Sequence, residues 1–96
     1  MRKRVRKLVR EMVHGKPYEY YPLGEYVVSA PGVCGGRPTF KHTRIEVQLV
    51  LNLIASGEPL EQLLQNLKGR VPRKAVEESL QLAAALLKRE AVLVAA

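Results

Sequence analysis

Residues 43–89 read TRIEVQLVLNLIASGEPLEQLLQNLKGRVPRKAVEESLQLAAALLKR and carry the apolar spacing of three consecutive helices. Thr43 and Glu46 match the T-x-x-E capping box that begins many helices, and Gly57 is a residue type that often ends them. The first helix is apolar almost all round, so we expect it to be the buried centre of the domain. Its expected core residues are Val47, Val50, Leu51 and Ile54, with Leu49 and Leu53 widening the apolar face.

Proline opens each of the two helices that follow. Pro59 precedes four leucines at the spacing of one helix face, and Pro72 precedes a third helix that we expect to end near Arg89. A short turn containing Gly69 separates them, and this order is typical of a helix-turn-helix unit. The expected core residues are Leu60, Leu63, Leu64 and Leu67 in the second helix, and Val76, Leu80, Ala83, Ala84 and Leu87 in the third.

The first 16 residues are predicted to form a basic arm. They hold seven basic residues and one acid, so they carry +6 of the chain's net charge of +7. Apolar residues at i, i+3, i+4, i+7 and i+8 predict an additional N-terminal amphipathic helix, ended by Gly15 and Pro17. These apolar residues are Val5, Leu8, Val9, Met12 and Val13. We therefore divide the chain into the arm, residues 1–16, and a single domain, residues 17–96.

Between the arm and the helices the chain is rich in tyrosine, proline and glycine, so we expect irregular structure with one short strand at residues 26–29. The tyrosines either cover a small core, which is the commoner use, or form a stacking platform for single-stranded nucleic acid. At the other end, residues 91–96 are almost wholly apolar. Because an apolar terminus is unfavourable in water, we expect it to form a contact in a homodimer.

Composition excludes several classes of protein. The longest apolar run, residues 82–87, is far shorter than the roughly 18 residues of a membrane-spanning helix, and basic residues interrupt every apolar stretch near the N-terminus. We therefore expect a cytoplasmic protein. Cys34 is the sole cysteine, and with His14 and His42 it makes no metal-ligand set. No acid or oxyanion loop accompanies Cys34 and His42 as nucleophile and base, so we expect no cofactor and no enzyme activity.

A second basic cluster lies at the start of the third helix and in the turn before it. The helix dipole disfavours cations in a first turn by about 0.3–1 kcal/mol each, so stability alone does not explain them. Together with the helix amides they predict contacts with DNA phosphates. Glu77 and Glu78 follow one turn later and oppose base-specific reading by this helix. The candidate DNA-binding residues are Lys68, Arg70, Arg73 and Lys74.

The motif at residues 32–47, GVCGGRPTFKHTRIEV, contains residue types that favour a tight turn and the start of a helix. In this segment Gly35 and Gly36 permit a tight turn, and Pro38 stiffens the chain after it. Thr43 is predicted to cap the first helix, which leaves Arg44 free to pair with an acid or a phosphate.

In this motif the chain resembles the family of domain of unknown function 433, whose members are often described as VapB-like antitoxins. The likeness covers about residues 26–87. It implies a mainly α, homeodomain-like helix-turn-helix domain of three helices, preceded by a short N-terminal β element, commonly dimeric and partnered by a PIN-like ribonuclease toxin. It brings no catalytic residues. Where the family usually has glycine this chain has His42, which is among the residues tolerated at positive φ.

Two functions follow from these features. The first is a non-catalytic, dimeric antitoxin that contacts the DNA backbone and neutralises a PIN-like toxin. In this hypothesis the basic arm enters the toxin's carboxylate cluster, through Arg4, Arg6, Lys7 and Arg10. The alternative is a small structural or interaction module whose arm docks on a protein or an anionic membrane, with no specific DNA function. Glu77 and Glu78 favour the alternative.

Overall fold

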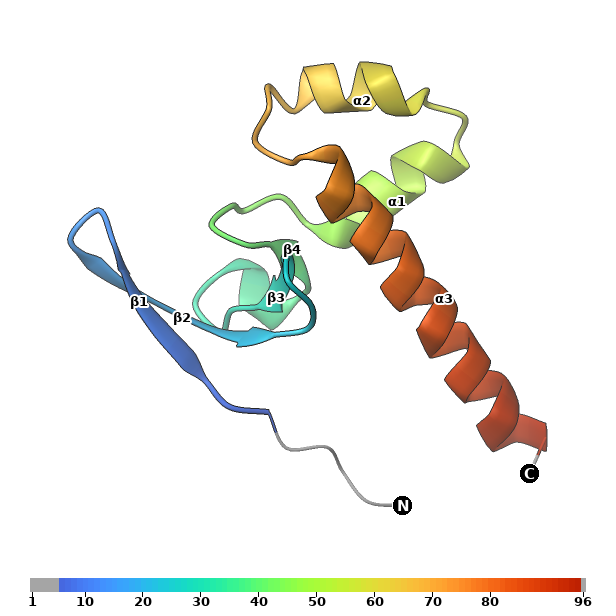
Figure 1. Ribbon diagram of the computed structural model, residues 1–96, viewed down its shortest axis with the longest axis horizontal. Coiled ribbons are helices and arrows are strands. Elements are labelled where there is room, and N and C mark those ends of the chain that lie inside the picture. Colours follow the sequence, from blue (N-terminus) through green and yellow to red (C-terminus); the bar gives the residue numbers. More distant parts are fainter. Residues whose placement is uncertain (1–5, 96) are drawn as a thin grey trace.

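The protein is a four-stranded antiparallel sheet followed by three helices (Figure 1). The computed structural model describes residues 6–95. The sheet is a meander in which each strand pairs with the next in sequence, and a short 3₁₀ turn, Cys34–Gly36, lies between the last two strands. The strands are β1 (Val9–Val13), β2 (Lys16–Pro22), β3 (Val27–Ser29) and β4 (Thr39–Phe40), and the helices are α1 (Val47–Ala55), α2 (Leu60–Asn66) and α3 (Arg73–Ala95).

This architecture corrects the predicted fold class. The chain is not a mainly α, homeodomain-like three-helix domain, because the sheet is a substantial part of it. The predicted N-terminal amphipathic helix is also wrong, since β1 occupies residues 9–13 and alternates between half-buried and exposed positions. Five residues with β-branched valines at both ends satisfy a strand pattern as well as a helical one. Pairing with β2 decides between the two patterns, because it satisfies the backbone of β1.

The turn between β1 and β2 shows why the helix reading failed. His14 and Gly15 have φ values of 52° and 75°, and Val13 lies opposite Lys16 in the register. A two-residue loop with positive φ at both positions matches the twist of a hairpin. Gly15 is therefore a hairpin residue and not the end of a helix.

The strand predicted at residues 26–29 is present as β3. It pairs with β2 through Tyr21 and Ser29, and with β4 through Val27 and Phe40. Neither β2 nor β4 was expected. The prolines and tyrosines of β2 are typical of irregular structure, and β4 has only two residues. The family resemblance implies only a short N-terminal β element, whereas the structure has a four-stranded meander.

The main core lies between the β3–β4 end of the sheet and the helices. Val47 and Val50 are buried as predicted, but Leu49 is 55% exposed, so α1 is buried on one face and not all round. A smaller cluster of Tyr20, Val28 and Ala30 holds the hairpin side of the sheet. The main cluster comprises Val27, Phe40, Val47, Val50, Leu63, Val71, Ala75 and Val76.

The predicted capping box does not form. The Thr43 hydroxyl donates to the Phe40 carbonyl at 2.8 Å and accepts from the Ile45 amide at 3.0 Å, so it fixes the β4–α1 turn. Glu46 occupies the N-cap position of α1 without a side-chain capping bond. A hydroxyl of this kind bonds to its own turn as readily as to a helix terminus.

The third helix is longer and more exposed than expected. It continues to Ala95, and every residue from Ala84 to Ala95 is exposed, so this half extends away from the body of the molecule (Figure 1). Leu80 and Leu87, predicted to face inward, are 44% and 71% exposed. Val76 is buried as predicted, and Ala75 and Ser79 complete the buried face, with Leu82 packed against the core.

Candidate interaction sites

Glu78 fixes the β2–β3 loop to α3. Its carboxylate accepts three backbone N–H groups, from Glu25 at 2.8 Å, Tyr26 at 2.8 Å and Val27 at 3.0 Å. Gly24 leaves room for the carboxylate in this position, because a Cβ there would lie 2.5 Å from Glu78 Oε1. Glu78 was interpreted from the sequence as an acid that opposes base-specific contact with DNA. In the structure it is an internal tether between α3 and the β2–β3 loop.

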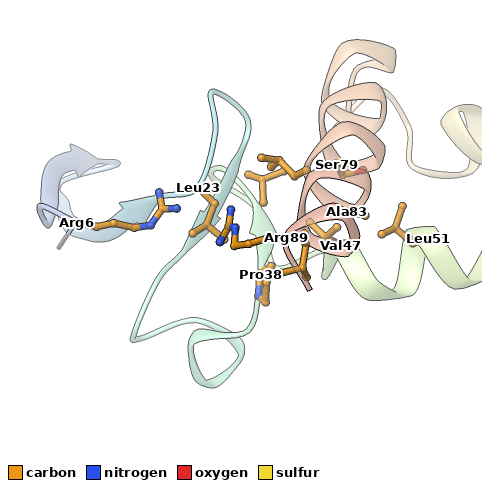
Figure 2. A pocket seen from close by; sticks show the side chains of 11 residues that line it. Arg6, Leu23, Pro38, Val47, Leu51, Ser79, Ala83 and Arg89 are labelled. Carbon is orange, nitrogen blue, oxygen red and sulfur yellow. The ribbon is translucent and has the colours of Figure 1, made fainter. Parts of the chain in front are cut away.

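An apolar groove of about 290 Å³ lies beside this tether, between the sheet and α3 (Figure 2). Its walls come from the β2–β3 loop, the segments around β3, β4 and α1, and the middle of α3. The apolar lining includes Leu23, Val27, Pro38, Val47, Leu51, Leu82 and Leu86. A groove of this composition can bind an apolar side chain or an aliphatic ligand.

Two arginines line the same groove. Arg6 comes from the segment before β1 and Arg89 from the exposed half of α3, and in Figure 2 both reach toward Leu23. The Arg6 Nη1 donates to the Pro22 carbonyl at 2.7 Å, which orients its guanidinium. Arg6 was a predicted partner-binding residue, whereas Arg89 was not recognised. The spacing of Arg89 with Leu82 and Leu86, at i, i+4 and i+7, was the available signal.

The other predicted arm residues do not gather with Arg6. Lys7 is exposed, and Arg10 pairs across the hairpin with Glu19 at 3.7 Å. Arg4 lies outside the described residues. The hairpin therefore distributes these cations over different surfaces, whereas the predicted helix placed them on one face.

The predicted DNA-binding residues cluster at the α2–α3 turn. Lys68 and Gly69 have φ values of 54° and 72°, and Lys68, Arg70 and Lys74 are exposed. Arg73 forms an ion pair with Glu61 at the start of α2. All four cations are thus exposed around a left-handed turn, and one of them, Arg73, is partly neutralised within the chain.

The glycines of the motif form a tight turn, as their residue type predicted. Gly35 and Gly36 have φ values of 64° and 84°, and Ser29 Oγ donates to the Gly36 carbonyl at 2.7 Å. The Pro38 carbonyl accepts from the Val47 amide at 3.0 Å. These contacts attach the turn to β3 and to the start of α1.

Arg37, not Arg44, makes the ion pair of this segment. Arg37 Nε lies 2.9 Å from Glu46 Oε1, and this hydrogen bond holds the pKa of Glu46 below its usual value. Arg44 is exposed at a small pocket bordered by Tyr18 and Glu19, and it has no ion pair within residues 6–95.

A polar cluster connects the hairpin to the β4–α1 turn. Glu11 accepts from His42 Nε2 at 2.8 Å and from the Tyr20 hydroxyl at 2.7 Å, while the His42 amide donates to the Tyr18 hydroxyl at 3.0 Å. The bonds from His42 and Tyr20 hold the pKa of Glu11 below its ordinary value. The hydrogen bond to Glu11, together with burial, raises the pKa of Tyr20 to about 12. His42 has a φ of 65°, a value that histidine tolerates.

The geometry gives Cys34 and His42 different partners. Cys34 Sγ donates to the Arg44 carbonyl at 3.5 Å, whereas the His42 ring faces Glu11. In the described part of the chain, no three His, Cys, Asp or Glu side chains converge as metal ligands. Across residues 6–95, none of the helices has the length and apolar character needed to span a membrane.

Comparison with known proteins gives the family. The model of the family described as "Protein of unknown function (DUF433)" matches residues 27–83, which is more than half of the chain. The chain belongs to this family, as the motif at residues 32–47 predicted. No curated protein and no solved structure matches it. The matched segment runs from β3 into α3, so the β1–β2 hairpin and the exposed end of α3 lie outside it.

Proposed function

We propose that this protein is a non-catalytic binding protein of the antitoxin type, which neutralises a PIN-like ribonuclease toxin and contacts the DNA backbone. The supporting observation is the exposed half of α3, where large apolar side chains extend beyond the body of the domain. They are Leu86, Leu87, Val92, Leu93 and Val94, between 45% and 83% exposed. An apolar surface of this kind marks a protein interface.

The exposed half of α3 offers a limited apolar binding energy. Fully burying a large apolar side chain contributes about 1.5–3 kcal/mol, and roughly half of that is left to gain at half-exposed positions. Five such residues contribute roughly 4–8 kcal/mol before the costs of association. Burial of α3 alone therefore gives weak binding, and polar contacts from elsewhere in the chain must add to it.

A heptad pattern on one flank of α3 supports a homodimer. Leu80, Leu87 and Val94 are spaced by seven, with Ala84 and Ala91 between them, and all five are exposed. This is the spacing of positions d and a in a coiled coil. An antiparallel pair of such helices places each large side chain against an alanine, which lets the helices approach closely. The proposed dimer predicts that Leu87→Glu converts the protein to a monomer in light scattering, whereas Ala85→Glu, on another face, leaves the dimer intact.

The cations of the α2–α3 turn support contact with DNA phosphates. Lys68, Arg70 and Lys74 are exposed, while Arg73 pairs with Glu61. Three phosphate contacts predict that log affinity falls with log salt at a slope of about −3. A flat salt response, or unchanged DNA affinity after alanine replaces Lys68, Arg70 and Lys74, contradicts this part of the proposal.

The toxin part is tested with the product of the adjacent gene. The full chain and that product are purified together, and ribonuclease activity is titrated with added chain. We expect complete inhibition at equimolar amounts, loss of inhibition in Leu93→Glu, and full inhibition by the control Ala85→Glu. Undiminished cleavage with the wild-type chain contradicts the function, and equal inhibition by Leu93→Glu contradicts the role of α3.

The alternative is an interaction module that does not bind DNA. The Arg73–Glu61 and Arg10–Glu19 ion pairs favour it, because they reduce the free charge of both basic segments. Flotation with anionic vesicles and a DNA mobility-shift assay on the same preparation distinguish the two. Vesicle binding without a DNA shift supports the alternative.

A further inference from the structure

The groove beside α3 combines an apolar lining with two arginines that lack acidic partners. Within residues 6–95, neither Arg6 nor Arg89 forms an ion pair. Both line the same groove and reach toward Leu23 (Figure 2). Two like charges near one apolar surface are unfavourable until an anion joins them. An anion bound at this groove is therefore attracted to both guanidinium groups.

The apolar surface does not stop at the groove. Leu82, Leu86, Arg89 and Leu93 recur at i, i+4, i+7 and i+11, so they follow one face of α3. Leu82 and Leu86 line the groove, whereas Leu93 lies beyond it and is 45% exposed. The series spans about 16 Å at the rise of an α-helix. This face is longer than the groove and matches a helical segment of about three turns.

We infer that this groove and the adjoining face of α3 bind an acidic amphipathic helix of a partner protein. The helix lays its apolar side along Leu82, Leu86 and Leu93, and its carboxylates lie between Arg6 and Arg89. This inference rests on the proposed function and adds the chemistry that the partner must present. An aliphatic carboxylate is the other ligand of matching chemistry, but it would leave Leu93 uncovered.

Fluorescence anisotropy with labelled synthetic peptides tests the inference on the full chain. One peptide is an amphipathic helix of about four turns with leucines on one side and glutamates beside them; its counterpart has lysine at each glutamate. The chain is used as wild type, as Arg6→Glu/Arg89→Glu, and as a control variant, Lys16→Glu/Lys88→Glu. The control makes the same change in net charge at exposed residues that do not line the groove.

The wild type should prefer the acidic peptide over the basic one, and the groove variant should lose about tenfold in affinity for the acidic peptide. Reversing two charges turns two attractions into repulsions, each worth roughly twofold to fivefold at an exposed site. The groove variant should also gain affinity for the basic peptide, while the control variant should behave like the wild type. Equal binding of both peptides, no binding of the acidic peptide, or equal losses in the two variants overturns the inference.

Two further measurements separate this inference from its premises. Dodecanoate that binds in the groove more tightly than the acidic peptide overturns the choice of a helix as occupant. In the ribonuclease titration, inhibition by the wild type and equally by Arg6→Glu/Arg89→Glu overturns the groove and leaves the proposed function standing. If the wild type does not inhibit but the peptide preferences hold, the toxin function fails and the groove stands.

Discussion

Removal of the Glu78 carboxylate should destabilise the protein more than any other surface substitution on α3. In Glu78→Ala three backbone N–H groups lose their acceptor, of which those of Tyr26 and Val27 are partly buried. A buried donor left without a partner costs about 1–3 kcal/mol, while the exposed Glu25 amide can bind water instead. The expected loss is therefore about 2–4 kcal/mol out of a total stability of roughly 5–14 kcal/mol for a chain of this length.

Two other variants test the same contact between Glu78 and the β2–β3 loop. Glu78→Gln keeps one oxygen for the Tyr26 and Val27 amides but turns an NH₂ group toward the Glu25 amide, so about 1–2 kcal/mol is expected. Gly24→Ala should weaken the same tether, because the added Cβ in the loop would displace the Glu78 carboxylate. Because Leu23 and Val27 line the groove, both changes should also weaken partner binding.

Urea unfolding followed by circular dichroism measures these losses, and Glu77→Gln is the matched control. Glu77 is exposed, so its substitution should change stability by no more than about 0.5 kcal/mol. In thermal unfolding, Glu78→Ala should lower Tm by roughly 10–30 °C. Equal stability of Glu78→Ala and Glu77→Gln would refute the tether.

Four other predictions follow from contacts in the sheet. Thr39→Val should raise the free energy of unfolding by about 1 kcal/mol in urea melts, because the buried Thr39 hydroxyl has no hydrogen-bond partner in the described chain; a destabilised variant contradicts this. Gly15→Ala should cost about 1 kcal/mol at its φ of 75°, and an unchanged melt refutes the hairpin turn. The folded state lowers the pKa of Glu11, so the contribution of Glu11 to the free energy of unfolding is present above pH 4.5 and is lost as pH falls through the lowered pKa. Acid unfolding of Glu11→Gln should lack this loss, and identical acid unfolding curves for the variant and the wild type argue against the contact. Tyr20 should ionise near pH 12, so its contribution is complete below pH 10 and lost as pH rises toward 12; tyrosinate absorbance of Tyr20→Phe should lack this late step.

The helical half of the fold was predictable because its signals are local. Prolines at 59 and 72 stand immediately before α2 and α3, and Gly57 follows α1 with a positive φ. These residue types act through their own backbone geometry and need no distant partner. The strand at β3 and the family motif are local signals of the same kind.

The hairpin and the groove were not predictable because they depend on contacts between distant residues. The apolar residues of β1 fit a helix until β2 pairs with them, and Tyr20 and His42 meet at Glu11 only after the sheet forms. Arg6 and Arg89 come from opposite ends of the chain. The basic turn before α3 is contiguous in sequence, so its residues could be named together from the sequence, and its contact with DNA stays a prediction.

The central claim is that a protein partner binds the exposed half of α3 and the groove beside it. Titrating the ribonuclease activity of the adjacent gene's product with the wild-type chain and with Arg6→Glu/Arg89→Glu tests it most directly. The account predicts complete inhibition at equimolar wild-type chain and about tenfold weaker inhibition by the variant, since two charge pairs of about 0.7 kcal/mol each correspond to a factor of ten. Equal inhibition by the wild-type chain and by the variant would contradict the role of the groove, and undiminished cleavage in excess wild-type chain would contradict binding of this toxin.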